Sequence, residues 1–318
     1  MDFTKELKDR VTHIEKVIEN YMPKDATLQK TVTDAMNYTM SAGGKRIRPL
    51  LMSETYRLFG GTEELIEPFM AALEMIHTYS LIHDDLPALD NDDYRRGRKT
   101  AHIVYGEAMA ILAGDSLLNY AYETAAKAYA LIPISDIEDT DAMQRELLQR
   151  RSVDRAMAVL AAHPRIVWPA KPGIYGMIGG QVADVELTGT KLTKEQLVYI
   201  YENKTGALIE AAMMIGAILA GASEKDIVKV EEAAYNIGMA FQIQDDILDE
   251  TATFEELGKP IHSDEECGKV TYVTIHGIDE SGKEVSRLSN EAIAMLESMG
   301  EDAEFLVELT RSLIHRTK

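Results

Sequence analysis

Apolar side chains recur along the chain at intervals of three and four residues, which is the spacing of one face of an α-helix. The segment 67–86, EPFMAALEMIHTYSLIHDDL, shows this most clearly, with Phe69, Leu73 and Ile76 on one face. Pro87 lacks an N–H and disfavours helical geometry at the residue before it. This helix is therefore predicted to end within a turn of its paired aspartates.

Comparable patterns predict helices along most of the remaining chain. The segments are 3–21, 28–40, 106–130, 142–162, 173–187 and 192–221, then a helix that begins near residue 233 and carries the second acidic motif, followed by two more after residue 283. The segment 163–173 contains three prolines and the single tryptophan, and it is predicted to be an irregular loop. Nowhere do polar and apolar residues alternate over a length that demands a strand. We therefore predict one all-α domain, residues 1–318, with ten or more helices around a central cavity.

Two predicted helices are rich in small residues. The segment 106–130 is rich in alanine, so it suits either the centre of a bundle or a dimer interface. Within 173–187, Gly176, Gly179 and Gly180 each cost up to roughly 1 kcal/mol relative to alanine. We interpret these glycines as places where a ligand or another backbone comes close.

A turn with glycines followed by basic residues separates the second and third predicted helices. Gly43 and Gly44 free the backbone. The basic residues Lys45, Arg46 and Arg48 follow within four positions. Lysine binds anions as a point charge and arginine as a planar fork of donors, so the turn suits a phosphate group. A plain surface turn explains the same residues, and the pattern alone does not decide between the two.

The most informative stretch is 76–102, where acidic residues precede basic ones. It contains Asp84, Asp85, Asp90, Asp92 and Asp93, followed by Arg95, Arg96, Arg98 and Lys99. On a helix, His77 and Asp84 share one face two turns apart, and a loop after Pro87 can bring Asp90 back toward Asp84. Converging carboxylates repel one another and require a cation. Mg²⁺ fits, because it binds oxygen ligands and is usually shared with substrate phosphates. A solvated charged turn is the alternative.

A second acidic motif lies about 160 residues later in a predicted helix. Gln242, Asp245, Asp246 and Asp249 follow the spacing i, i+3, i+4, i+7 and form one polar stripe among apolar residues. An unpaired buried carboxylate is very costly, so the stripe must face water, a partner charge or a metal. An exposed helix end is the alternative. We expect the two acidic clusters to face each other across the cavity, each binding Mg²⁺ and together holding one diphosphate.

Lys204 lies on the apolar stripe of the predicted helix 192–221. A lysine in this place either extends its ammonium group to water along the apolar surface or reaches into a cavity that holds an anion. We favour the cavity.

Composition narrows the class of protein. The chain has 46% hydrophobic residues, enough for a large core, and 53 acidic against 33 basic residues, for a net charge of -20. Such a surface repels nucleic acid, so no nucleic-acid partner is expected. The single cysteine, Cys267, excludes an internal disulfide and suits a reducing compartment. With no apolar run of about 18 residues, no transmembrane segment is expected and a cytoplasmic location is predicted.

Several motifs together resemble one enzyme family. They are GGKRIRP, IHTYSLIHDDLPALDNDDYRRG, GMIGGQVAD, the KT pair after Asn203, FQIQDDILD, and the ELGKP and KVTY segments. In order and spacing they are similar to those of trans-prenyltransferases, specifically short-chain polyprenyl diphosphate synthases of the farnesyl diphosphate synthase type. The resemblance runs from about residue 30 to the C-terminus. Two aspartate-rich motifs with these elements between them are highly specific, whereas DDxxD alone is not.

The resemblance implies an isoprenoid synthase-type bundle, usually a homodimer, with Mg²⁺ as cofactor. The implied reaction joins isopentenyl diphosphate to an allylic diphosphate, such as dimethylallyl or geranyl diphosphate, and releases diphosphate. Isopentenyl diphosphate is implied to bind Lys45, Arg48, His77 and Arg96, and the allylic diphosphate to bind Arg95, Lys204, Lys259 and Lys269. The implied metal ligands are Asp84, Asp85, Asp90, Asp245, Asp246 and Asp249, with Thr205 and Gln242 beside the carbocation. The family assigns the final proton transfer to the departing diphosphate.

Product length is implied by the residues before the first acidic motif. In bacterial-type relatives, an aromatic residue at the position of Tyr79, about 7.5 Å below the motif along the helix, forms the floor of the cavity and accompanies a C15 product. Tyr79, with Ser80 beside it, therefore implies farnesyl diphosphate. A geranylgeranyl diphosphate synthase is the alternative. A terpene cyclase is the alternative from another class, although it has little use for a second diphosphate site.

Three residues depart from the family pattern. Lys99 stands where proline is common, Ile103 where lysine is common and His262 where glycine is common. These departures concern loop shape and substrate preference. A metal phosphohydrolase built on His83 is disfavoured, because few other histidines lie near acidic residues. A regulatory subunit without activity is disfavoured because both acidic motifs are intact.

Overall fold

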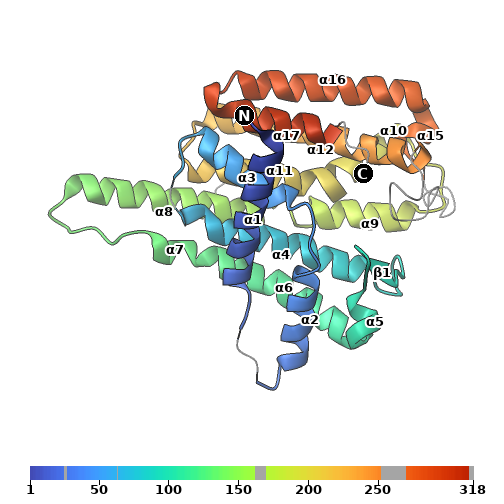
Figure 1. Cartoon of the computed structure of the whole chain (residues 1–318), viewed down its shortest axis with the longest axis horizontal. Helices are drawn as coiled ribbons and strands as arrows, with labels where there is room; N and C mark the ends of the chain where they lie inside the picture. Colours follow the sequence, from blue (N-terminus) through green and yellow to red (C-terminus); the bar gives the residue numbers. More distant parts are fainter. Residues whose placement is uncertain (25–26, 63, 162–169, 252–269, 315–318) are drawn as a thin grey trace. The chain divides into compact units, whose positions relative to one another are not determined.

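The computed structural model describes residues 1–24, 27–62, 64–161, 170–251 and 270–314. Most of these residues lie in helices (Figure 1), which confirms the predicted all-α fold. They form two compact units, each described by itself below. Unit 1 comprises Met1–Ser53 and Thr62–Met157, and unit 2 comprises Glu54–Gly61 and Ala158–Lys318. The single domain over residues 1–318 stays a prediction.

Unit 1 is built from helices and one short hairpin. Its elements are α1 (Phe3–Tyr21), α2 (Lys30–Met40), the start of α3 (Ile47–Leu58), the 3₁₀ helix η1 (Glu64–Ile66), α4 (Glu67–Asp84), β1 (Tyr94–Arg95), β2 (Arg98–Lys99), α5 (Ala101–Tyr105), α6 (Glu107–Ala126), α7 (Ala128–Leu131) and most of α8 (Thr140–Ala161). The predicted helices at 3–21, 28–40 and 142–162 are recovered within two residues at each end.

Helix α4 forms the core of unit 1, where it lies against α1, α2 and α6. Residues 68–76 are all buried, so the helix is enclosed on every side rather than along a single stripe. Pro68 occupies the first turn, where its missing N–H removes no helical hydrogen bond. The helix ends at Asp84, as the proline three residues later predicts. The core of unit 1 therefore fixes the end of the helix that carries the first acidic motif.

A short hairpin follows the first acidic motif. β1 pairs antiparallel with β2, with Tyr94 opposite Lys99 and Arg95 opposite Arg98. The turn residues Arg96 and Gly97 both have positive φ angles, 53° and 74°, as a tight two-residue hairpin turn requires. Sequence alternation cannot reveal strands of two residues, so this hairpin was not predicted.

Unit 2 is entirely helical in its described part. Its elements are the end of α8, α9 (Met177–Leu187), α10 (Lys194–Ile200), the π-helix η2 (Tyr201–Gly206), α11 (Ala207–Leu219), α12 (Glu224–Thr251), α15 (Tyr272–His276), α16 (Ile278–Glu297), the 3₁₀ helix η3 (Glu301–Ala303) and α17 (Glu304–Ile314). Every residue of α11 is buried, and this helix lies against α12 and η2. The predicted helix 192–221 is thus interrupted by a π-helical turn that contains Lys204, a feature that is common at functional sites.

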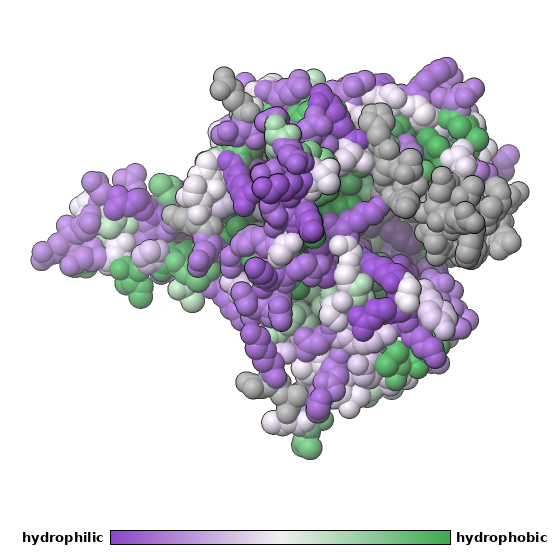
Figure 2. All heavy atoms as spheres, viewed as in Figure 1, coloured by the Kyte–Doolittle hydropathy of each residue, from purple (hydrophilic) through white to green (hydrophobic). Residues whose placement is uncertain are grey.

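The molecular surface is mainly hydrophilic on the face drawn in Figure 2. Figure 2 shows hydrophilic residues over most of the face drawn, with hydrophobic residues in small groups between them. Among the described residues, no helix is both long and apolar enough to cross a membrane.

Candidate active site

The loop after α4 folds back on the helix end. The backbone N–H of Asp90 donates to the carbonyl oxygen of Asp84 at 2.9 Å, and that of Asn91 donates to Leu86 at 3.1 Å. Asn91 adopts a positive φ of 55°, which asparagine tolerates better than most residues. Asp84 is half-buried and Asp90 is exposed. The predicted return of Asp90 toward Asp84 is therefore confirmed for the backbone.

Asp85 differs from its two neighbours in the motif. Its side chain is buried, with the residue only 3% exposed, and its Oδ1 accepts a hydrogen bond from Arg95 Nε at 2.6 Å. Burial raises the pKa of Asp85 to about 6, although the ion pair with Arg95 acts in the opposite direction. Arg95 also lies 3.6 Å from Asp92. Asp85 thus fastens the hairpin β1–β2 to the end of α4.

The basic turn at residues 43–48 lies against the tip of this hairpin. Arg96 Nη1 donates a short hydrogen bond to the carbonyl oxygen of Gly43. A Cβ atom on Gly44 would lie 2.6 to 3.0 Å from the Arg96 guanidinium, and Gly44 has a φ of 142°. Only glycine fits at this position without displacing the arginine. Both glycines have positive φ angles, as the predicted freeing of the backbone requires, and Gly44 in addition leaves room for the Arg96 guanidinium.

His77 lies on α4, where it is half-buried and surrounded by arginines. Its pKa is lowered well below 6.5 by burial and by Arg48, Arg96, Arg95 and Arg46, in that order. Burial also lowers the pKa of Arg48 to about 10, so this arginine still carries its charge at neutral pH. The Nε atom of Arg48 is buried and has no hydrogen-bond partner among the described residues. Unit 1 thus assembles Arg48, His77 and Arg96 into one cationic cluster, as an anion site requires.

The residues assigned to product length occupy the last turns of α4. Tyr79 is 6% exposed, and its ring packs edge-on against His83 with the centroids 5.8 Å apart. Burial raises the pKa of Tyr79 to about 12, so its hydroxyl stays protonated. Ser80 is half-buried and donates to the His77 carbonyl oxygen at 2.8 Å. His83 fills the space over Gly114 of α6 and so packs α4 against α6.

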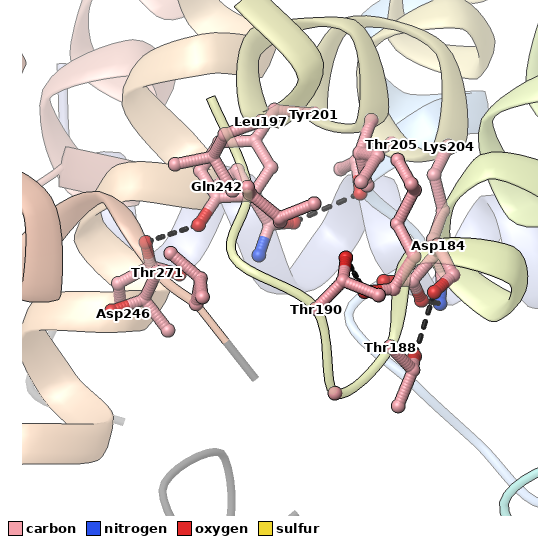
Figure 3. A pocket seen from close by; sticks show the side chains of 15 residues that line it. Asp184, Thr188, Thr190, Leu197, Tyr201, Lys204, Thr205, Gln242, Asp246 and Thr271 are labelled. Atoms are coloured by element: carbon pink, nitrogen blue, oxygen red, sulfur yellow. Dashed lines mark hydrogen bonds and ion pairs between the residues drawn. The ribbon is translucent and has the colours of Figure 1, made fainter. Parts of the chain in front are cut away.

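Unit 2 contains a pocket of about 120 Å³ (Figure 3). Its walls come from α9, the loop after α9, α10, η2, α12 and the residues just before α15. The polar residues among those lining it are Asp184, Thr188, Thr190, Tyr201, Lys204, Thr205, Gln242, Asp246 and Thr271. Three residues predicted to act on the allylic substrate, Lys204, Thr205 and Gln242, are therefore brought together here.

Lys204 points into the pocket, where its Nζ lies 2.6 Å from Asp184 Oδ2 (Figure 3). Lys204 therefore lines a pocket, as the preferred prediction requires, whereas the anion that this pocket is predicted to hold stays a prediction. The position of Lys204 depends on Gly180 of α9, because a Cβ there would lie 2.2 Å from the Lys204 backbone nitrogen. The glycines of α9 thus permit close approach of another backbone, one of the two explanations that the sequence left open.

Thr205 and Gln242 are joined directly. The Thr205 hydroxyl donates to Gln242 Oε1 at 2.9 Å (Figure 3). This contact links η2 to α12 and fixes the orientation of the Gln242 amide, since its oxygen is occupied as an acceptor. The two oxygen dipoles therefore enter the pocket as one rigid pair.

The second acidic motif lies near the end of α12, and its members face different surroundings. Asp245 is exposed, whereas Asp246 and Asp249 are buried. Asp246 Oδ2 accepts a short hydrogen bond from the Tyr201 hydroxyl and one of 2.8 Å from the Tyr272 backbone N–H. The sequence analysis treated these aspartates as one polar stripe. In the structure, Asp246 fastens α15 and η2 to α12, whereas Asp245 is exposed to solvent.

Some predicted site residues lie outside the described residues. These are Lys259 and Lys269, together with His262. Conversely, three site residues were not predicted. Asp184 pairs with Lys204, Tyr201 binds Asp246, and Glu74 is a buried acid within the apolar helix α4. The isolated glutamate in an apolar segment is a signal that could have identified Glu74.

The sequence model of the polyprenyl synthetase family matches residues 29–309. A geranylgeranyl diphosphate synthase of Cyanophora paradoxa is 46% identical over 262 residues, covering 82% of this chain and 79% of that protein. A farnesyl diphosphate synthase of Geobacillus stearothermophilus is 41% identical over 269 residues, covering 84% and 82%. A solved geranyltransferase of Helicobacter pylori, complexed with magnesium and isoprenyl diphosphate, is similar with a TM-score of 0.78 and 26% identity, covering 99% of this chain and 97% of that chain.

These likenesses cover 82% to 99% of this chain. They do not support a terpene cyclase, since each relative named above is a prenyl diphosphate synthase or transferase. The chain belongs to the polyprenyl synthetase family and is an enzyme that transfers prenyl groups.

Proposed function

We propose that this protein condenses isopentenyl diphosphate with dimethylallyl and then geranyl diphosphate, giving farnesyl diphosphate and releasing diphosphate. The observation that carries the C15 product is Tyr79, a large buried aromatic side chain in α4 five residues before Asp84. An aromatic ring braced by His83 resists displacement by a growing hydrocarbon chain. Geranylgeranyl diphosphate is the alternative product, favoured by the identity to the Cyanophora paradoxa enzyme.

The proposed cofactor is Mg²⁺, and the carboxylates fit it. Asp84 and Asp90 bring two carboxylate-bearing residues together in unit 1, and Asp245 offers an exposed carboxylate in unit 2. No group of three potential ligands converges tightly enough to hold a metal ion among the described residues. The predicted convergence of carboxylates into such a group is therefore not found in the described part of the chain. In the proposal, Mg²⁺ would keep several waters and take one or two carboxylates plus substrate phosphates. When bound, the ion would neutralise the charge on the diphosphate that leaves.

Asp85, Asp246 and Asp249 take different parts in this proposal. Asp85 is occupied by Arg95, and Asp246 by Tyr201 and Tyr272, so we assign both to holding neighbouring segments in place. Asp249 is buried one turn further along α12. We propose Asp84, Asp90 and Asp245, the less buried members of the two motifs, as the metal ligands.

The cationic residues divide between two diphosphates. Lys45, Arg48, His77 and Arg96 form the proposed isopentenyl diphosphate site in unit 1. A neutral His77 can donate one hydrogen bond to a phosphate oxygen, while the arginines supply the charge. Arg95 and Lys204, with Lys259 and Lys269 of the undescribed segment, are proposed for the allylic diphosphate. Lys204 would exchange its contact with Asp184 for a phosphate oxygen.

The reacting carbon requires groups that stabilise a cation without attacking it. Thr205 and Gln242 supply oxygen dipoles from fixed positions, which is the arrangement that stabilises developing charge most effectively. Ionisation of the allylic C–O bond leaves a carbocation and diphosphate. The double bond of isopentenyl diphosphate attacks this cation, and the departing diphosphate accepts the proton. No side-chain base is required.

We further propose that the protein is a cytoplasmic homodimer that pairs through α5 and α6. One face of α6 packs on α4 through Ala110, Ala113 and Leu117. Apolar residues of the opposite surface are exposed, including Ile111 at 43% and Leu112 at 46%. Apolar patches of this kind mark protein interfaces. The single cysteine supports the reducing compartment.

The proposal is tested by incubating the protein with Mg²⁺, isopentenyl diphosphate and each allylic primer in turn, followed by chromatographic sizing of the products. We expect farnesyl diphosphate as the main product from both dimethylallyl and geranyl diphosphate, and no product after chelation with EDTA. Asp84→Asn and Asp245→Asn are expected to lower turnover at least a hundredfold. Products of 20 carbons or more would overturn the C15 assignment, and activity in EDTA would overturn the metal assignment.

A further inference from the structure

Arg46 is the middle basic residue of the turn at 43–48, and its side chain points into the protein. The residue is 2% exposed and has a left-handed φ of 47°. Its guanidinium donates from Nε to Glu15 Oε1 at 2.8 Å, from Nη1 to Glu74 Oε1 at 2.7 Å and from Nη2 to the Met40 carbonyl oxygen at 2.7 Å. A fourth bond runs from Nη2 to Glu15 Oε2 at 3.2 Å. With these bonds formed, Arg46 is not directed at a ligand.

The partners of Arg46 belong to three different helices. Glu15 lies on α1, the Met40 carbonyl oxygen closes α2, and Glu74 lies in the buried middle of α4. The Arg46 carbonyl oxygen also accepts the first hydrogen bond of α3, from the Leu50 N–H at 3.0 Å. A single side chain therefore fixes the turn against α1, α2 and α4 at once.

Glu74 connects this network to the cationic cluster. It is 2% exposed and lies one turn before His77 on α4. Its negative charge supports the charged forms of Arg46, Arg48 and Arg96, and in each case acts to raise the pKa of the arginine against the lowering effect of burial. Glu74 is thus a shared counter-charge behind three arginines, two of which are proposed to bind isopentenyl diphosphate.

A positive φ at an arginine, together with the positive φ angles of Gly43 and Gly44, describes a backbone that the surrounding structure must hold in place. Lys45 and Arg48 flank Arg46 in the chain, so the direction of Arg46 determines how these two side chains are presented. If the Arg46 bonds were lost, the turn would no longer be fixed relative to His77.

We propose that Arg46 and Glu74 are positioning residues that hold the 43–48 turn so that Lys45, Arg48 and His77 together bind the diphosphate of isopentenyl diphosphate, without touching it themselves. This inference rests on the proposed function. Of the three basic residues in the turn, it assigns Arg46 to the protein interior. It also gives the buried Glu74 a supporting role at the proposed anion site.

Two single substitutions that change the charge in opposite directions separate positioning from simple electrostatics. Arg46→Met removes a positive charge and Glu74→Gln removes a negative one. If only net charge matters, the KM for isopentenyl diphosphate rises in the first variant and falls in the second. If positioning matters, this KM rises in both, by roughly tenfold to a hundredfold, as expected when a binding group is misplaced by about 1 Å. The KM for geranyl diphosphate should stay within twofold in both.

Two further variants guard against misfolding. The double variant Arg46→Met/Glu74→Met replaces a buried ion pair by apolar residues, an exchange that folded proteins tolerate better than the loss of one partner. It should fold and still show the raised KM for isopentenyl diphosphate. Leu309→Ala, at a buried position of α17 in unit 2, is the control for lost stability alone and should leave both KM values unchanged.

Binding of inorganic pyrophosphate to the protein, measured by calorimetry without catalysis, provides a second readout and should weaken in the variants at Arg46 and Glu74. An unchanged or lowered KM for isopentenyl diphosphate in Glu74→Gln would overturn the inference, as would equal rises for both substrates. If the wild-type protein forms no prenyl product at all, the proposed function fails instead.

Discussion

Replacing Gly180 by alanine tests the close approach of α9 to the π-helix that carries Lys204. An added Cβ would lie 2.2 Å from the Lys204 nitrogen, 2.7 Å from the Asn203 carbonyl carbon and 2.8 Å from the Lys204 Cα. All three are backbone atoms, so no side chain can rotate away. Since ordinary contacts begin at 3.4 Å, the two backbones must separate by about 1.2 Å.

Two opposing effects determine the expected change in the free energy of unfolding. Alanine favours a helix over glycine by about 1 kcal/mol, whereas overpacking costs about 1 to 3 kcal/mol. The net loss in the free energy of unfolding for Gly180→Ala is therefore about 1 kcal/mol. A shift of about 1 Å at Lys204 and Thr205 should lower kcat by roughly a hundredfold.

Gly282→Ala provides a matched control. Gly282 lies within α16, and nothing would meet its Cβ within 4 Å. This variant should gain about 1 kcal/mol of stability from helix propensity and keep full activity. Urea denaturation and steady-state kinetics on both variants decide the matter. A Gly180→Ala enzyme that is as stable as Gly282→Ala and turns over at the wild-type rate would refute the argument.

The other predictions concern product length, protonation and assembly. Tyr79→Ala should shift the products toward 20 carbons and longer, because it removes the side chain that we propose as the floor of the product cavity; an unchanged product distribution by chromatography would contradict this. His77 should stay neutral between pH 6 and 8 by NMR, since its pKa is lowered. Only the unfolded state then gains a proton on acidification, so stability falls as the pH drops below about 6.5. From pH 7 to 5.5 the wild type should lose up to about 1.3 kcal/mol more than His77→Asn in urea unfolding, and an equal loss in both would be inconsistent with a neutral His77. Ile111→Glu/Leu112→Glu should convert the proposed dimer to a monomer in light scattering, whereas a dimer that persists would exclude this face of α6 as the interface.

Local sequence predicted the helices well because their signals are local. The apolar period set the position of α4, and Pro87 set its end. The same reasoning could not detect the π-helix at 201–206, since one extra residue per turn leaves the apolar spacing nearly intact. Nor could it detect the hairpin at Tyr94–Lys99, whose strands are too short to alternate and whose form depends on the positive φ angles of its turn.

Within each charged motif, the sequence could not separate binding residues from anchoring ones. Asp84, Asp85 and Asp90 are equivalent as letters, yet only Asp85 is buried against Arg95. Arg46 and Arg48 are both basic residues of one turn, and the sequence does not reveal that the Arg46 guanidinium is paired with Glu15 and Glu74 inside unit 1. These assignments depend on residues far away in the chain, which no local pattern reports.

The sequence by itself determined the all-α fold, the family and the identity of the charged motifs, because helix periodicity and motif spacing are properties of neighbouring residues. Only the tertiary structure decided which of those charges face inward and which remain open to a substrate. The physical reason is that burying a charge is tolerated only where folding supplies a partner, and the partners Glu15, Glu74 and Tyr201 come from other helices.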